Sequence, residues 1–249
     1  MIRRLAVISD VHGNRPALEA VLDDIRRRGI EQIVNLGDCL YGPLDPAGTA
    51  DLLIRLDMTT VRGNEDRILT HLPEDSTGAM SLDFTRRSLS TAHISWLASL
   101  KPTSVAFDDF FLCHGRPDRD DQYLFYGVGP EGARVRSAAD LEADTREITQ
   151  RVILCGHDHT PNQVILPDGR LIVNPGSVGL QAYTDATPYY HCMQSGSPEA
   201  RYAILTLTIG GWQVEHVAVI YDWQAAADLA KQNGREDWSR WLVTGCAQK

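Results

Sequence analysis

Side chains of the types that bind transition metals recur at one kind of place in this sequence, directly after short apolar runs. Each apolar run is typical of a buried β-strand, so the polar residue that follows it falls where the strand ends. Because strand ends in an open parallel sheet meet along one edge, we expect these side chains to converge there. The seven residues are Asp10, His12, Asp38, Asn64, His114, His157 and His159.

Seven nitrogen and oxygen donors are enough for two metal ions that share one ligand. We expect Asp38 to be the shared ligand, because a carboxylate has two oxygens and carries charge for both cations. Imidazole and carboxylate donors suit Mn, Fe, Co, Ni or Zn, and we take Mn as the first candidate. Two such ions, roughly 3.5–4 Å apart, can hold a hydroxide and neutralise phosphoryl oxygens. The donor set therefore predicts a dinuclear hydrolase site.

Each of these residues alone also has an ordinary explanation. Asp and Asn are common turn residues, and a lone Asp-x-His segment is more often solvated than bound to metal. The spacing of His157 and His159 after a strand lets both side chains point to one side, which favours ligation. It is the complete set, in order, that favours a metal site. A glycine accompanies nearly every candidate ligand, which we interpret as a need for tight turns.

The surrounding sequence alternates strands and helices, which favours an α/β domain with a largely parallel sheet at its start. We expect a single domain over residues 1–249, with a C-terminal helical extension from about residue 222. Residues 127–132 are expected to form a glycine-rich loop, and residues 183–200 a long loop. We expect strands over residues 5–8, 32–36, 59–61, 104–107, 110–113, 152–155, 163–166, 171–173, 201–208 and 212–219. We expect helices over residues 16–28, 46–56, 66–100 with a break near 73–78, 141–150 and 223–232, and a short helix near Trp238.

Composition narrows the class of partner. The 249 residues carry a formal charge of −9, which gives no general attraction to nucleic acid or anionic membranes. Five cysteines without a CxxC spacing predict neither a disulfide framework nor a zinc knuckle, and favour a cytoplasmic setting. No stretch approaches the roughly 20 apolar residues of a membrane span, and the apolar run after residue 4 is too short for a signal peptide. We therefore expect a small phosphorylated substrate, with a nucleotide as one candidate, and neither long nucleic acid nor a membrane as partner.

The order of these segments resembles the calcineurin-like metallophosphoesterase superfamily. The matching segments are residues 10–14, 37–38, 63–66, 114–115 and 156–159, and residues 174–179 resemble its small bacterial and archaeal phosphodiesterase branch. The resemblance implies an α/β fold of the four-layer α+β type, in which a β-sandwich of mixed sheets is flanked by helices.

The resemblance also implies how the ligands divide. One metal would bind Asp10, His12, Asp38 and His159, and the other Asp38, Asn64, His114 and His157. A hydroxide bridging the two ions would be the nucleophile. Asp66 and Asp158 would stand behind the ligands, where orienting an imidazole or amide is the physical task open to them.

One departure from the family concerns the proton donor. Many members have a histidine directly after the metal-binding asparagine, where it can protonate the leaving group, whereas this chain has Glu65 beside Asn64. A glutamate has an ordinary pKa of about 4.3 and becomes a general acid only if its surroundings raise that value. We hypothesise that leaving groups already stable as anions are preferred, such as aryl alcohols and nucleotide phosphates.

Several further residues are candidate substrate contacts. Asn14, Arg15 and Arg116 adjoin the motifs, although a salt bridge is an equal alternative for each arginine. His191 is the best replacement for the missing acid, and its neighbours Tyr189 and Tyr190 could stack on a base. The tryptophans at positions 223, 238 and 241 are interpreted as packing residues, with a contact in a homo-oligomer as the alternative.

Together these features predict an enzyme that hydrolyses phosphodiester or nucleotide phosphoanhydride bonds, with Asp38, Asn64 and Glu65 nearest the chemistry. A phosphomonoesterase, including a protein phosphatase, is the alternative within enzymes. A non-catalytic binding module of the same fold is the alternative outside them, and it usually goes with lost ligands.

Overall fold

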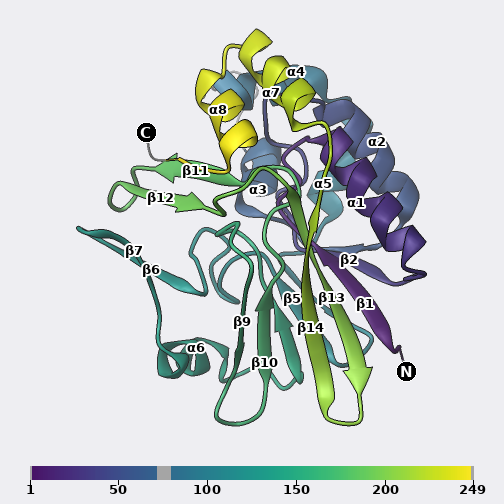
Figure 1. The fold of residues 1–249 in the computed structure, drawn as a ribbon, viewed down its shortest axis with the longest axis vertical. Helices are drawn as coiled ribbons and strands as arrows, with labels where there is room; N and C mark the ends of the chain where they lie inside the picture. The colour runs from purple at the N-terminus through teal and green to yellow at the C-terminus, as the bar shows by residue number, and fades with distance from the viewer. Residues whose placement is uncertain (1, 72–79, 248–249) are drawn as a thin grey trace.

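Two five-stranded β-sheets form the centre of the protein (Figure 1), whose computed structural model describes residues 2–71 and 80–247. The first sheet runs in the order β14 (Gly211–Val219), β13 (Ala200–Thr208), β1 (Arg4–Ile8), β2 (Ile33–Asn35) and β3 (Thr59–Thr60). The second runs in the order β4 (Thr103–Ala106), β5 (Phe110–Cys113), β8 (Val152–Leu154), β10 (Leu171–Asn174) and β9 (Asn162–Ile165).

The two sheets pack face to face over an apolar layer, and the alternation of side chains along β1 explains why. Leu5 and Val7 point into the layer between the sheets, whereas Ala6 and Ile8 point to the opposite side and contact helices. All four are fully buried. A strand buried on both faces needs a continuous apolar run, which is the pattern that predicted this strand.

Helices cover both outer faces of the sandwich (Figure 1). The buried side chains of seven helices share one cluster with the outward face of the first sheet. These helices are α1 (Arg15–Arg27), α2 (Pro46–Leu56), α3 (Asn64–His71), α4 (Met80–Ser88), α5 (Thr91–Ser99), α7 (Trp223–Gln232) and α8 (Glu236–Thr244). On the other side, Leu141 of α6 (Ala138–Thr145) packs with the outward face of the second sheet. The expected sandwich of mixed sheets flanked by helices is confirmed.

Because of strand direction, the loops that follow β1 and β2 lie at one edge of the first sheet, and those that follow β5 and β8 lie at one edge of the second. Strand β1 pairs in parallel with β2 and β2 with β3, while β8 pairs in parallel with both β5 and β10. Antiparallel strands lie at the margins: β13 beside β1, β4 beside β5, and β9 beside β10. The carboxyl ends of the parallel strands in each sheet therefore share one edge.

Two segments expected to be loops are β-hairpins instead, so these predictions were wrong. Residues 127–132 fall within the pair β6 (Tyr126–Gly129) and β7 (Gly132–Val135). Most of the expected loop 183–200 is the pair β11 (Ala182–Asp185) and β12 (His191–Gln194). Both ribbons lie outside the main sheets, and their short strands lack the continuous apolar runs that predicted the central strands.

The predicted helix over 141–150 is shifted. It begins at Ala138 because Ser137 and Asp140 form a capping box, and it ends at Thr145. The long helical stretch over 66–100 is divided into α3, α4 and α5. The break expected near 73–78 lies outside the described residues. None of the helices within residues 2–71 and 80–247 is long and apolar enough to cross a membrane.

A buried hydrogen bond ties α1, which starts at the first metal-ligand motif, to the first sheet. The hydroxyl of Tyr202 on β13 donates to Asp24 of α1 over 2.6 Å. Burial raises the pKa of Asp24, but the hydrogen bonds from Tyr202, Arg28 and Arg27 outweigh it and hold the pKa below its ordinary value of 3.8. The bond is therefore made to an ionised carboxylate at neutral pH.

We expect Tyr202→Phe to lower the free energy of unfolding by about 1.5–3 kcal/mol near pH 7, because a hydrogen bond to a charged group is lost. A carboxylate whose pKa is lowered on folding stabilises the protein above about pH 4, and that contribution is lost as the pH falls further. The difference between the variant and the wild type should therefore shrink below pH 4. Urea unfolding at pH 7 and pH 3.5 measures this, with exposed Tyr190→Phe as the control. A difference that stays constant with pH would contradict this account.

Candidate metal centre

The seven predicted ligands lie in the loops that follow the parallel strands. Asp10 and His12 follow β1, Asp38 follows β2, and His114 follows β5. His157 and His159 follow β8, and Asn64 is the first residue of α3. Among the predicted ligands, two groups of three residues have ligand atoms within 4.8 Å of one another: Asp10, His12 and His159, and Asp38, His114 and His157. Each group is part of one of the two ligand sets implied by the resemblance.

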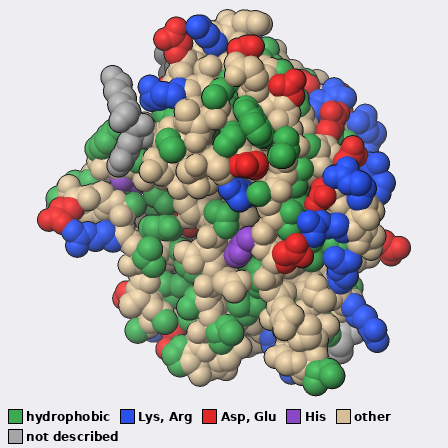
Figure 2. Space-filling model, viewed as in Figure 1, with side chains coloured by type: hydrophobic (Ala, Val, Ile, Leu, Met, Phe, Trp, Pro, Cys, Tyr) green, Lys and Arg blue, Asp and Glu red, His purple; other side chains and the backbone are tan. Residues whose placement is uncertain are grey.

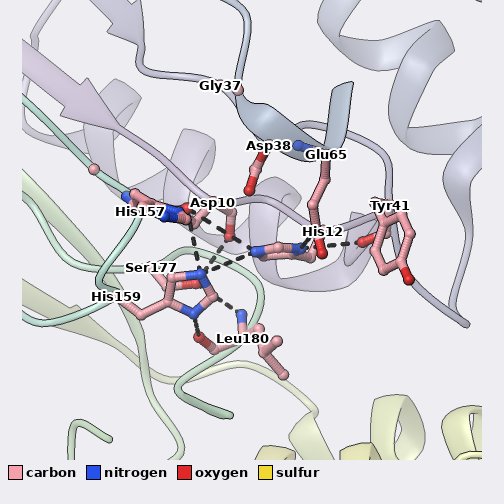
Figure 3. A network of polar contacts seen from close by, with 12 residues as sticks. Asp10, His12, Gly37, Asp38, Tyr41, Glu65, His157, His159, Ser177 and Leu180 are labelled. Atoms are coloured by element: carbon pink, nitrogen blue, oxygen red, sulfur yellow. Dashed lines mark hydrogen bonds and ion pairs between the residues drawn. The ribbon is translucent and has the colours of Figure 1, made fainter. Parts of the chain in front are cut away.

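The imidazoles of the first group turn their Nε2 atoms toward one another. The Nδ1 atom of His12 lies 3.1 Å from the carbonyl oxygen of Tyr41, and Nδ1 of His159 lies 2.6 Å from that of Leu180. A carbonyl only accepts, so Nδ1 carries the hydrogen in both rings. The two Nε2 atoms are then lone-pair donors, yet they lie only 3.1 Å apart (Figure 3).

The carboxylates complete this arrangement. Asp10 uses Oδ2 to accept the amide hydrogen of His157, while its Oδ1 lies 3.3 Å from Nε2 of His159. Asp38 uses Oδ1 to accept the amide hydrogen of Glu65, while its Oδ2 lies 3.2 Å from Nε2 of His114. In each residue one oxygen fixes the loop and the other faces the cluster.

His114 repeats the pattern of the first group. Its Nδ1 donates to the carbonyl oxygen of Leu36 over 2.8 Å, so Nε2 carries a lone pair. Within the described residues, this Nε2 is buried without a hydrogen-bond partner, and so are Oδ1 of Asp10 and Oδ1 of Asn64. Buried polar atoms are rarely left unpaired in folded proteins. Facing nitrogens and orphaned oxygens of this kind fit divalent cations and could hold two of them.

The pKa values of the histidines in the absence of cations also fit a metal site. Burial lowers the pKa of His12 and of His114, but the neighbouring carboxylates outweigh it and raise the values to about 9 and about 10. Burial, reinforced by the charge of His114, lowers the pKa of His157 to about 4. A proton thus takes the position on His12 and His114 that a cation would otherwise occupy.

Five of the ligands have left-handed backbone conformations. The φ angles are 55° at Asp10, 52° at His12, 51° at Asp38, 72° at His157 and 62° at His159. Such conformations cost about 1–3 kcal/mol each in residues other than glycine, and they concentrate at functional sites. The predicted ligands therefore make sharp turns themselves, together with their neighbours Gly13 and Gly37, whose φ angles are 67° and 98°.

Two of the glycines beside the predicted ligands allow neighbouring loops to approach one another closely. A Cβ atom on Gly63 would overlap the carboxylate of Asp38, and one on Gly156 would overlap the hydroxyl of Ser9. Neither glycine has a positive φ. They leave room for the ligand loops to pack against one another.

Asp66 and Asp158 act on backbone rather than on ligand side chains, so the expectation that they orient an imidazole or amide was wrong. The two oxygens of Asp66 accept the amide hydrogens of Cys39 and Gly63. Asp158 accepts the amide hydrogen of Thr160 over 2.9 Å. Burial raises the pKa of Asp66 to about 6 and that of Asp158 to about 7. The imidazoles are oriented instead by the carbonyl groups of Leu36, Tyr41 and Leu180.

Glu65 is held against a predicted ligand. Its Oε2 lies 3.1 Å from Nδ1 of His12 (Figure 3). Burial raises the pKa of Glu65 to about 7, although the contact with His12 acts in the opposite direction. The reference value used in the sequence analysis therefore does not describe this glutamate.

A cavity of about 430 Å³ opens beside the cluster. Its lining includes His12, Asp38, Asn64, His157 and His159, together with Glu65. It also includes residues that the sequence analysis did not connect with the site: Tyr41, Met80, Tyr123, Tyr183, Arg235, Trp238 and Trp241. Most of these lie far from the motifs in sequence, and the tryptophans have the helical spacing of ordinary packing residues. No local signal separates them from core positions.

The structure contradicts the predicted substrate contact of Asn14. Its side chain is fully buried, caps α1 by accepting the amide hydrogen of Ala17, and donates to Gly179 and Tyr221. No polar atom of this side chain is left for a ligand. Asn14 therefore holds the first ligand loop in place.

Of the two arginines, Arg15 shows the salt-bridge alternative, because it pairs with Glu19 and Asp45, and it is not among the residues that line this cavity. Arg116 forms an ion pair with Asp144 over 3.0 Å. It lines a neighbouring hollow that also includes Asn64 and His157, so it remains a candidate contact.

The hairpin β11–β12 reaches the site differently from the prediction. His191 is buried and its Nε2 lies 2.8 Å from the hydroxyl of Tyr123, which stands between it and the cavity. Tyr189 and Tyr190 are exposed and do not line the cavity, so the expected base-stacking position was wrong. Tyr183 of β11 lines it instead, and its ring packs against that of His159.

Comparison with known proteins agrees with this geometry. The model of the calcineurin-like phosphoesterase superfamily domain matches residues 4–196. An uncharacterized protein of Methanocaldococcus jannaschii is 27% identical over an alignment 259 residues long, which covers 94% of this chain and 94% of the other. A metallophosphoesterase from Sphaerobacter thermophilus is 25% identical with a TM-score of 0.76, over 99% of this chain and 100% of the other.

A hypothetical protein from Pyrococcus horikoshii shares the fold, with 19% identity and a TM-score of 0.76 over 99% of this chain and 100% of the other. The match to the superfamily model extends over far more than half of the chain. The protein therefore belongs to the calcineurin-like phosphoesterase superfamily and is a hydrolase of the metallophosphoesterase type.

Proposed function

We propose that the protein is a two-metal hydrolase of small phosphodiesters or nucleotide phosphoanhydrides. The observation that carries the proposal is the buried cluster, in which imidazole nitrogens and carboxylate oxygens face one another and several of them lack a hydrogen-bond partner among the described residues. When bound there, two divalent ions would activate a water molecule for attack on phosphorus and neutralise the phosphoryl oxygens.

The chain's own residues would hold the reactants in place. Asp38 lies between the two groups of donors. Its Oδ2 faces His114, and its carboxylate lies within 4.8 Å of ligand atoms of both His12 and His157. We propose Asn64, whose side-chain oxygen is buried and unpartnered, as a further ligand. The backbone carbonyl groups behind the imidazoles would keep the nitrogens aimed during turnover.

The surroundings of the cluster support a small, singly charged substrate. Glu65 lines the cavity next to the ligands, and its negative charge would disfavour the doubly charged phosphate of a monoester. On the face shown in Figure 2, basic and acidic side chains intermingle along the flank formed by α1 and α2 and form no basic stripe there. A cavity of about 430 Å³ suits a small molecule rather than a polymer.

Two parts of the proposal rest on composition and donor chemistry alone. Manganese is the first ion to test, because the donors are imidazole and carboxylate groups. A cytoplasmic location is proposed from the odd number of cysteines.

Metal binding should be measurable without any substrate. We expect Mn at about a hundred times its dissociation constant to stabilise the protein by roughly 2.7 kcal/mol, which corresponds to a rise in melting temperature of about 5–10 °C. Asp38→Asn should lose most of this rise, because the amide keeps the shape but not the charge. Asp23→Asn, a carboxylate exposed on α1, is the control and should behave like the wild type. An equal rise in all three proteins would contradict the proposed site.

Substrate class is tested by comparing three compounds with and without Mn: an aryl phosphodiester, an aryl phosphomonoester and a dinucleoside polyphosphate. We expect Mn-dependent hydrolysis of the diester or the anhydride, reduced by about a hundredfold or more in Asp38→Asn, because mutation of groups behind a ligand alone costs 10–100-fold. Hydrolysis of the monoester alone would overturn the proposed substrate class. Failure on all three compounds would favour a binding module.

The contact between Glu65 and His12 makes a separate prediction. Glu65→Gln keeps an oxygen that can accept from Nδ1 of His12, so hydrolysis of an aryl diester should change by less than about threefold. Glu65→Ala removes that oxygen and should weaken Mn binding by about 10–100-fold. Rates on aryl and alkyl leaving groups, measured beside the Mn affinity, distinguish the roles. A strong loss in Glu65→Gln confined to alkyl leaving groups would identify Glu65 as a proton donor instead.

A further inference from the structure

The part of the cavity lined by Tyr41, Arg235 and Trp238 has the features of a recognition site. Arg235, which precedes α8, lies with its guanidinium carbon 5.4 Å from the centre of the Trp238 ring. Trp238 in turn lies edge-on to His12, with ring centres 5.8 Å apart. This wall is therefore adjacent to the predicted metal ligands, and one small molecule in the cavity of about 430 Å³ could reach both.

We propose that Arg235 and Tyr41 bind the organic group of the substrate, and that this group is a planar, hydrogen-bonding ring of the nucleobase type. This inference rests on the proposed function, since it assigns the part of the substrate that lies beyond the phosphate.

The orientation of Arg235 is fixed before any ligand binds. Its Nε and Nη2 atoms donate to the two carboxylate oxygens of Asp237 over 2.9 Å and 2.8 Å, and Nη1 donates to Ser81. A guanidinium has five N–H groups, so two remain after these contacts. A planar group held in this way loses little freedom when a ligand binds.

The charge of Arg235 is already balanced. The bidentate contact with Asp237 compensates its positive charge, so the pair offers little net attraction to a second phosphate. What Arg235 still offers is a planar surface and two N–H donors. Those features suit a flat heterocycle with carbonyl or ring-nitrogen acceptors better than an anion or an alkyl chain.

Tyr41 adds a polar group to the same wall. Its backbone carbonyl orients His12, while its side chain lines the cavity. Within the described residues its hydroxyl has no hydrogen-bond partner. A hydroxyl that can both donate and accept, beside a planar donor, matches the edge of a nucleobase.

The test compares two substrates with the same leaving group, thymidine 5′-(p-nitrophenyl phosphate) and ethyl p-nitrophenyl phosphate. For the Mn-loaded wild type we expect kcat/KM to be at least tenfold higher for the thymidine ester. Arg235→Met should remove roughly tenfold of this preference, and Tyr41→Phe roughly threefold, with the ethyl ester little affected. Arg235→Lys keeps the charge but not the plane, and we expect it to resemble Arg235→Met. Arg240→Met, an exposed residue of α8 outside the cavity, should match the wild type.

Binding of thymidine 5′-monophosphate and of ethyl phosphate, measured by calorimetry, gives a readout that does not need turnover. Equal kcat/KM for the two esters in the wild type, or an unchanged preference in Arg235→Met, would overturn the inference. A preference retained in Arg235→Lys would mean that charge decides, and would overturn the planar ligand. If neither ester is hydrolysed, the proposed function fails, and calorimetry decides the inference alone: tighter binding of the nucleotide that depends on Arg235 supports it, and equal binding of the two phosphates rejects it.

Discussion

The arrangement of the site depends on one electrostatic constraint, which is that its buried donor atoms cannot satisfy one another. Backbone carbonyls take the Nδ1 hydrogens of His12, His114 and His159, and this leaves three Nε2 lone pairs directed at carboxylate oxygens or at another lone pair. Protein groups that would pair with these atoms are absent from the part of the chain that the structure describes, as the orphaned Oδ1 of Asp10 illustrates. Such a cluster is stable only with cations or protons between its atoms, and this is why it suits a metal.

The two-sheet scaffold is what makes the constraint tolerable. Left-handed backbone at Asp10, Asp38 and His159 is unfavourable, and it persists only where the surroundings determine it. Here each strained loop leaves a strand that is buried on both faces, and neighbouring loops are joined by hydrogen bonds such as those from Cys39 and Gly63 to Asp66. The stability of the sandwich therefore offsets the cost of a preorganised site, and loss of an apparently remote contact in the core would reach the ligands through these loops.

The sequence predicted the parts of the site that depend on local rules. The seven predicted ligands follow parallel strands, and the rule for strand ends accounts for their common position in the fold. Asn14 was misread because a polar residue beside a motif was assumed to face the site, whereas its side chain turns inward to cap α1. Arg235 and Tyr41 were missed because only tertiary packing brings α8 against the loop after β2. For Glu65, burial raises the pKa, and a reference value for the free side chain cannot predict that change.

The balance of charge links these observations to the choice of substrate. An ionised Glu65 beside the cluster would reduce the positive charge that two divalent cations bring to it, and Arg235 adds little because Asp237 compensates its charge. A diester or an internal phosphoanhydride phosphate carries one negative charge and is less affected by that reduction than a monoester dianion. A histidine in place of Glu65 would leave more of that positive charge and would accommodate the dianion better. The identity of this one residue beside Asn64 therefore affects both the protonation of the leaving group and the charge of the phosphate that the site accepts.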